Sequence, residues 1–290
     1  MFKTVACASA AIALTACTPA ATRAEPAMWV VKDADSEIYL LGAVHLLRPE
    51  LAWKSPRISK ALAACGDLTL ELADPDNAAA IAPWIRAHGF DPANPLSSRL
   101  TEAERARLAQ AAATLKLAPE QLEPMRPWLA ALTLSIAPLL RAGYDPQAGV
   151  DRLLMADARA RGKPVRGFET AESQVKMLAG LPEQTQLDFL RESLDDYADA
   201  TVELDKLAEA WAGGRTEEID RLVNDEVRDV HPALYRALLV DRNAGFARQI
   251  KGMLDDSSGP RCVAVGAAHL AGSDSVQAKL KAMGVKAERY

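Results

Sequence analysis

The sequence predicts an α/β protein, or α+β in the way its elements are segregated. One sheet is built from strands at both ends of the chain, with a large helical insertion in the middle. Two observations predict this. Short apolar runs of strand composition occur near the N-terminus and again after residue 260. The segment from Asn77 to about Leu254 shows mostly helical spacing of apolar residues. The chain of 290 residues is 49% hydrophobic, which is ample for a complete core.

The predicted strands are short apolar runs bounded by turn residues. They are Met28–Val31, Glu37–Leu41, Asp67–Leu72, Pro164–Glu169, Arg261–Val265 and Val285–Tyr290. The first two flank the turn segment Asp33–Ser36, a pattern typical of a β-hairpin.

Each predicted helix has a boundary signal. Ser55 and Pro56 open one that runs through Ala64, and Thr101 with Glu104 forms a capping box. The remaining predicted helices are Gly149–Ala160, Pro182–Trp211, Pro232–Met253 and Asp274–Met283. Three prolines, Pro124, Pro127 and Pro138, are expected to break the apolar stretch that contains them.

The first residues have the form of a secretory signal. A cationic start is followed by an uncharged segment too short to span a bilayer, and Leu14–Cys17 resembles a bacterial lipobox. We therefore expect a signal peptide over 1–17 with a lipidated Cys17, a tether over 18–27 and one domain over 28–290. Thr18 favours the outer membrane by the same resemblance, so the expected location is the periplasm, with a lipid anchor in that membrane. The alternative is ordinary cleavage near Ala24, which removes Cys17.

Two cysteines, Cys65 and Cys262, remain in the predicted mature chain. Each lies at or just before a predicted strand, and an oxidising periplasm allows them to pair. Two buried thiols are the alternative, because spacing alone does not supply disulfide geometry.

Charge and motifs exclude several classes of function. The net charge is −5 and there is no run of Lys or Arg, so nucleic acid is not an expected partner. The sequence has no Gly-x-Ser-x-Gly elbow, no His-Glu-x-x-His helix, no P-loop and no dinucleotide glycine fingerprint.

Two strand ends match each other and carry the candidate chemistry. One reads Gly42-Ala-Val-His45-Leu and the other Gly266-Ala-Ala-His269-Leu, and the chain has only four histidines. Histidines that follow strands of one sheet can converge where such sheets bind ligands. Two imidazoles with a carboxylate form an open site for Mn, Co or Zn. A hydrogen-bonded structural histidine is the alternative for either residue alone.

Glu71 is the candidate carboxylate, because an acid that ends an apolar strand is costly to bury without a partner. It would be a ligand or a base, and a surface acid is the alternative. Weaker candidates for substrate binding are Glu169, Arg242 and Asn243. Glu169 could instead stabilise the start of the next helix, and Arg242 could form a surface salt bridge.

Taken together, these motifs resemble the TraB/GumN family. The resemblance covers roughly Met28 to Tyr290 and includes the Gly-Phe-Glu-Thr segment that ends at Thr170, where Phe168 stands in place of an expected Leu. The family is similar to the Tiki proteases, which are metal-dependent peptidases, and in layout to erythromycin esterase-like and haem-binding ChaN-like proteins. This resemblance implies that His45, Glu71 and His269 are both the catalytic and the metal-binding residues.

The expected function is therefore a metal-dependent hydrolase of the cell envelope, most simply a peptidase, acting on a peptide or a small molecule. A non-enzymatic lipoprotein that binds haem or a metal is the alternative. An envelope assembly protein with a decayed site is a third, with the acidic helical region 187–209 as its partner surface. The sequence does not define the oligomeric state.

Overall fold

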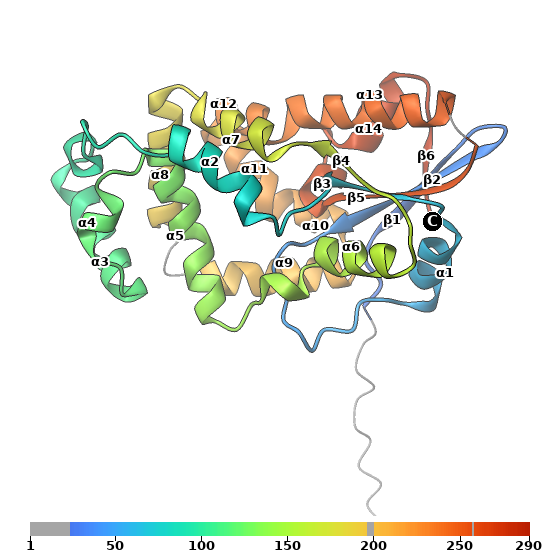
Figure 1. Ribbon diagram of the computed structural model, residues 1–290, viewed down its shortest axis with the longest axis horizontal. Coiled ribbons are helices and arrows are strands. Elements are labelled where there is room, and N and C mark those ends of the chain that lie inside the picture. The colour runs from blue at the N-terminus through green and yellow to red at the C-terminus, as the bar shows by residue number, and fades with distance from the viewer. Residues whose placement is uncertain (1–23, 196–199, 257) are drawn as a thin grey trace, which may run out of the picture.

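A six-stranded mixed sheet organises the molecule, seen in the computed structural model, which describes residues 24–195, 200–256 and 258–290 (Figure 1). The strand order is β4-β3-β5-β2-β1-β6. The strands are β1 (Met28–Lys32), β2 (Ser36–Ala43), β3 (Leu68–Leu72), β4 (Val165–Glu169), β5 (Gly259–Gly266) and β6 (Ala287–Arg289). Both ends of the chain contribute strands to one sheet, so the predicted fold class is confirmed. The predicted lipidation site, Cys17, lies outside the described residues.

Four of the strands run in the same direction. β2 pairs with β5, β5 with β3, and β3 with β4, all in parallel. β1 is antiparallel to β2 in the predicted hairpin, and β6 is antiparallel to β1. The carboxyl ends of the four parallel strands therefore meet at one edge of the sheet, where sheets of this kind bind ligands.

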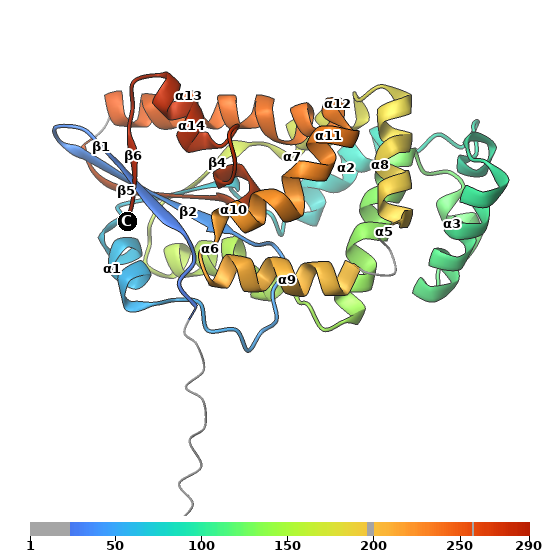
Figure 2. The same ribbon diagram turned by 180° about the vertical axis from the view of Figure 1, so that it is seen from behind.

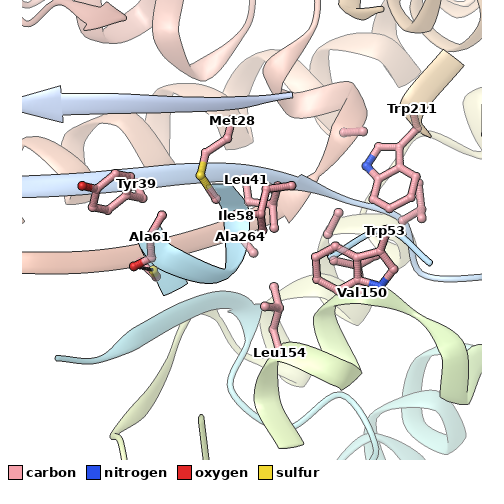
Figure 3. Close-up of a cluster of buried hydrophobic side chains, with 14 of the residues drawn as sticks. Met28, Tyr39, Leu41, Trp53, Ile58, Ala61, Val150, Leu154, Trp211 and Ala264 are labelled. Carbon is pink, nitrogen blue, oxygen red and sulfur yellow. Dashed lines mark hydrogen bonds between the residues drawn. The ribbon is translucent and has the colours of Figure 1, made fainter. Parts of the chain in front are cut away.

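Side chains alternate between the two faces of the sheet, and each face has its own hydrophobic core. On one face, Met28 and Leu41 pack with Ile58 and Leu154 of the helices α1 (Pro56–Ala64) and α6 (Val150–Ala160), as Figure 3 shows. The other face carries Val31 and Leu40. It is covered by α13 (Asp241–Asp255) and α14 (Val276–Ala282).

The middle of the chain is helical, as predicted, apart from β4. In Figures 1 and 2 its helices α2 to α5 and α8 lie beside the sheet, at the opposite end from the β1–β2 turn. The helices of the middle region, besides α6 and α13, are α2 (Ala78–His88), α3 (Glu102–Leu115), α4 (Pro119–Leu122), α5 (Pro127–Arg141), α7 (Ala171–Ala179), α8 (Glu183–Asp195), α9 (Ala200–Ala212), α10 (Thr216–Ile219), α11 (Asp225–Val230) and α12 (Pro232–Tyr235).

Several shorter turns complete the chain. They are η1 (Leu96–Arg99), η2 (Pro146–Ala148) and η6 (Ala267–Leu270), which are 3₁₀ helices, and η4 (Asp220–Asn224) and η5 (Arg236–Val240), which are π-helical.

The prediction that Pro138 breaks its helix is wrong, because Pro138 lies inside α5. Pro127 instead occupies the first turn, where its missing N–H costs no hydrogen bond. Packing explains the difference at Pro138. The buried residues of α5 lie N-terminal to Pro138 and pack in a cluster with α8. The helix therefore gains more free energy from burial than it loses through the one backbone hydrogen bond that Pro138 cannot form.

A disulfide joins Cys65, at the end of α1, to Cys262 on β5. It links segments 197 residues apart in sequence. Within the described residues, no helix has the length and apolar character needed to cross a membrane.

Candidate functional site

Four predicted site residues lie at the ends of the four parallel strands. His45 follows β2, Glu71 is on β3, Glu169 is the last residue of β4, and His269 lies in η6 directly after β5. The topology thus brings together residues that are up to 224 positions apart, counted from 45 to 269. Arg242 and Asn243 reach the same place from the start of α13.

The glycines of the two matching motifs have different roles. A Cβ on Gly42 would lie 3.3 Å from the Cα of Ala267, so this glycine lets η6 pack against β2. A Cβ on Gly266 would lie 3.2 Å from Glu71 Oε1 and 3.7 Å from His45 Nε2. Gly266 therefore keeps space open between the carboxylate and the exposed histidine.

His269 is buried and is fixed by two hydrogen bonds. Arg242 Nη1 lies 3.1 Å from its Nε2, and a guanidinium can only donate, so Nε2 is an acceptor. Its Nδ1 must then carry the proton and donate to Asn243 Oδ1 at 2.6 Å. Burial, with the nearby charge of Arg242, lowers the pKa of His269 to about 4. This imidazole is therefore neutral.

His45 has the opposite environment. Its side chain is 59% exposed, with Nδ1 3.2 Å from Asp151 Oδ2 and Nε2 3.9 Å from Glu71 Oε1. Desolvation of the ring lowers the pKa, but the hydrogen bond to Asp151 and the charge of Glu71 outweigh it and raise the pKa to about 9. His45 is therefore a cation at neutral pH.

Glu71 lies at the centre of the site, with its side chain 11% exposed. Its Oε1 accepts the backbone N–H of Gly266 at 2.6 Å, and its Oε2 accepts Arg242 Nη2 at 2.5 Å. Burial raises the pKa of Glu71, but the positive charges of His45 and Arg242, with the Gly266 hydrogen bond, outweigh this and hold the pKa below its ordinary value. The carboxylate stays ionised and interacts with each of the other charged groups.

Arg242 holds the two acids, Glu71 and Glu169, in place. It donates to Glu169 from Nε at 2.9 Å and from Nη2 at 2.8 Å, besides its contacts with Glu71 and His269. The π-helical η5 leads directly into α13 and provides the Leu238 carbonyl, which accepts from Arg242 Nη1 at 3.2 Å. Arg242 and Glu169, which we expected to bind substrate, thus bind each other.

Asn243 is also buried, and its amide donates to the backbone carbonyl of Asp274 at 2.9 Å. Its two hydrogen bonds connect His269 to the loop before α14. These contacts fit a residue that positions His269 better than one that touches substrate.

Sequence reasoning missed Asp151 and Arg152, which start α6. An acid in the first turn of a helix is ordinary, and nothing local connects residue 151 with residue 45. Only the fold shows the contact, since the loop that carries His45 packs on the first residue of this helix. The Val150 N–H donates to the Val44 carbonyl at 2.9 Å.

Some of the site residues line a cavity of about 500 Å³, within the range of small-molecule sites, whereas Glu169, Arg242, Asn243 and His269 lie behind its lining. Its polar lining includes His45, Glu71, Asp151, Arg152 and Gln174, and its apolar walls include Leu46, Leu72, Pro75, Ile136 and Pro146. A larger groove of about 1090 Å³ lies beside α14 and β6, but it contains none of the predicted site residues.

The predicted metal ligands are only partly arranged for a metal. The Nδ1 atoms of both histidines are held by oxygen acceptors, as in many metal-binding histidines. However, the Nε2 of His269 and the Oε2 of Glu71 are both engaged by Arg242. Over the described ranges, no group of three or more His, Cys, Asp and Glu side chains could hold a metal ion. The arrangement therefore does not fit a three-ligand centre.

Comparisons with known proteins agree with the motifs. Residues 27–289 match the model of the TraB/PrgY/gumN family. The chain is similar to the uncharacterized protein YbaP of Escherichia coli (strain K12), with 24% identity over 256 residues that cover 88% of this chain and 92% of the relative. The uncharacterized protein YbaP of Shigella flexneri is similar to the same extent. No solved structure matches. The family prediction is thus confirmed, and the chain belongs to the TraB/PrgY/gumN family.

Proposed function

We propose that this protein is a hydrolase that cleaves amide bonds, with Glu71 as base and His45 as acid. One observation carries the proposal: two titratable groups with opposite pKa shifts face each other across a small space in a cavity. His45 Nε2 and Glu71 Oε1 are 3.9 Å apart, and Gly266 leaves room beside both atoms. Groups shifted in this way are typical of acid–base pairs.

The proposed reaction begins with a water that hydrogen-bonds to both atoms. Glu71 takes a proton from this water as its oxygen attacks the amide carbonyl, and the imidazolium of His45 gives its proton to the leaving nitrogen. The C–N bond breaks, and the proton on Glu71 returns to His45. A carboxylate whose pKa lies below its ordinary value is a weak base. The neighbouring imidazolium compensates in part, because it supplies a proton when the leaving group needs it.

Arg242 and His269 support this pair. The guanidinium fixes the Glu71 carboxylate through Oε2 and leaves Oε1 facing the cavity. The neutral His269 closes the buried side of the site, and its Nε2 helps to hold Arg242. The Arg242 guanidinium thus supplies a fixed positive charge beside Glu71 and His269, where the sequence led us to expect a divalent ion.

A metal-dependent hydrolase, with Mn, Co or Zn held by His45, Glu71 and His269, is the second candidate. The oxygen acceptors on both Nδ1 atoms favour it. It requires Arg242 to leave His269, because one lone pair does not serve two partners.

Activity on a mixture of peptides, measured with and without a chelator, tests the proposal. Hydrolysis should survive chelation and fall at least about 100-fold in Glu71→Gln and in His45→Ala. His88→Ala, at the end of α2, is the matched control and should keep full activity. Activity that disappears with chelator and returns with Mn, Co or Zn would favour the second candidate. A haem spectrum without hydrolysis would favour the haem-binding alternative.

A further inference from the structure

Two adjacent residues that line the cavity, Asp151 and Arg152, each have one buried polar atom without a hydrogen-bond partner among the described residues. These atoms are Arg152 Nη1 and Asp151 Oδ1. Three described arginines have such an unpartnered nitrogen (Arg126, Arg152 and Arg228), and only Arg152 lines this cavity. Unpaired buried polar atoms are costly, so a ligand that pairs them gains affinity.

The guanidinium of Arg152 is only partly paired. Its Nε contacts Asp76 Oδ1 at 2.5 Å, while Asp151 is paired with His45 through the other oxygen, Oδ2. A guanidinium with free N–H groups prefers a carboxylate, which it can bind through two parallel hydrogen bonds. The acceptor Asp151 Oδ1 prefers an N–H.

Apolar residues line the same cavity as Asp151 and Arg152. Ile136 of α5 lines the cavity and is 42% exposed. Two more of the large exposed hydrophobic side chains among the described residues, Leu140 and Leu153, belong to α5 and α6, the helices that also contribute Ile136, Asp151 and Arg152. Exposed apolar side chains beside a polar site are typical of a binding surface.

We propose that the site accepts the C-terminal residue of a peptide, with an apolar side chain and a free carboxylate. The carboxylate binds Arg152, the N–H of the last amide bond donates to Asp151 Oδ1, and the side chain contacts Ile136, Leu72 and Pro75. Water then attacks the carbonyl before this N–H, the C–N bond breaks, and a free amino acid leaves. This inference rests on the proposed hydrolase, and it narrows the substrate to peptides cleaved from the carboxyl end.

Ligand binding tests the recognition separately from the reaction. We would measure the Kd of N-acetyl-leucine, N-acetyl-leucinamide and N-acetyl-glutamate with the Glu71→Gln protein, which is expected to lack turnover. N-acetyl-leucine should bind at least about 10-fold more tightly than the other two. Arg152→Gln should remove the preference over the amide, and Arg152→Lys should retain part of it. Arg159→Gln is the control, since Arg159 lies on the same helix, is 49% exposed and contacts Asp74, away from the cavity lining.

The outcomes separate this inference from the proposed function. Equal affinity for the acid and the amide, no binding of either, or a preference that survives in a folded Arg152→Gln protein would overturn the inference. The comparison of N-acetyl-leucine with N-acetyl-leucinamide does not use an Arg152 variant. It therefore tests the inferred carboxylate preference even if that variant misfolds. Hydrolysis of peptides amidated at the carboxyl end, at the rate of free acids, would keep the hydrolase and overturn the inference. A preference for the carboxylate without hydrolysis of any peptide would keep the inferred carboxylate site and overturn the proposed hydrolase.

Discussion

At the scale of single residues, the two histidines differ although their motifs match. His45 is exposed between two carboxylates, whereas His269 is buried between an arginine and an amide. One imidazole is therefore charged and the other neutral at pH 7. The repeated motif does not give the two histidines the same chemistry, because the side chains that contact each imidazole come from other parts of the chain.

The charge of His45 sets the expected pH dependence. If His45 is the acid, kcat/KM should stay level near neutrality and fall as the pH rises through about 9, where His45 loses its proton. Asp151→Asn removes a carboxylate that raises this pKa, so the fall should move to lower pH. A rate that rises through pH 9 would instead make His45 the base.

The raised pKa of His45 also makes the stability of the folded protein depend on pH. The folded-state pKa of His45 lies above its ordinary value of about 6.5. Its contribution to the free energy of unfolding is therefore fully present below pH about 6.5 and is lost as the pH rises through 9. Unfolding midpoints in denaturant at pH 6 and pH 10 should show this loss in the wild type and a smaller loss in Asp151→Asn.

Asn243 makes a separate prediction. Asn243→Leu leaves the buried Nδ1–H of His269 and the Asp274 carbonyl without their partner, so the free energy of unfolding should fall by about 1–3 kcal/mol. The exposed Asn94→Ala is the control and should change it by less than about 0.5 kcal/mol. An unchanged denaturation midpoint in Asn243→Leu would show that His269 finds another acceptor.

At the scale of elements, the glycines of β2 and β5 make the clearest contrast. Gly266→Ala puts a methyl group beside Glu71 Oε1 without a backbone penalty, so activity should fall at least about 10-fold while the protein stays folded. Gly42→Ala presses on the backbone of η6 and should cost about 1–3 kcal/mol of stability. Gly252→Ala in α13 meets no neighbour and should stabilise by about 0.4–1 kcal/mol. Kinetics and urea unfolding of all three proteins would check this.

Most elements could be predicted because their signals are local. Alternating apolar residues, caps such as Thr101 and turn residues depend on neighbours in sequence, and they gave the strands and most helix bounds. Pro138 was misjudged because the packing of α5 is a property of the fold. The meeting of His45, Glu71 and His269 could be expected from strand ends. The contacts of Arg242 and Asp151 could not, because they depend on how α13 and α6 pack against the sheet.

At the scale of the whole molecule, the Cys65–Cys262 disulfide closes a long loop that contains the entire helical middle. Its removal by Cys65→Ala with Cys262→Ala should lower the free energy of unfolding by about 2–5 kcal/mol, because the unfolded chain gains freedom. Thermal unfolding with and without a reductant measures this. A midpoint that does not respond to the reductant would contradict it.

The order of the strands has a consequence for biosynthesis. β5 lies between β2 and β3, yet it is made almost last, after residue 258. During translation, β2 and β3 have left the ribosome but lack the strand that joins them, so the sheet cannot close until synthesis is nearly complete. The first residues lead us to expect export, and for an exported chain this delay would keep the polypeptide unfolded while it is threaded through a translocation channel.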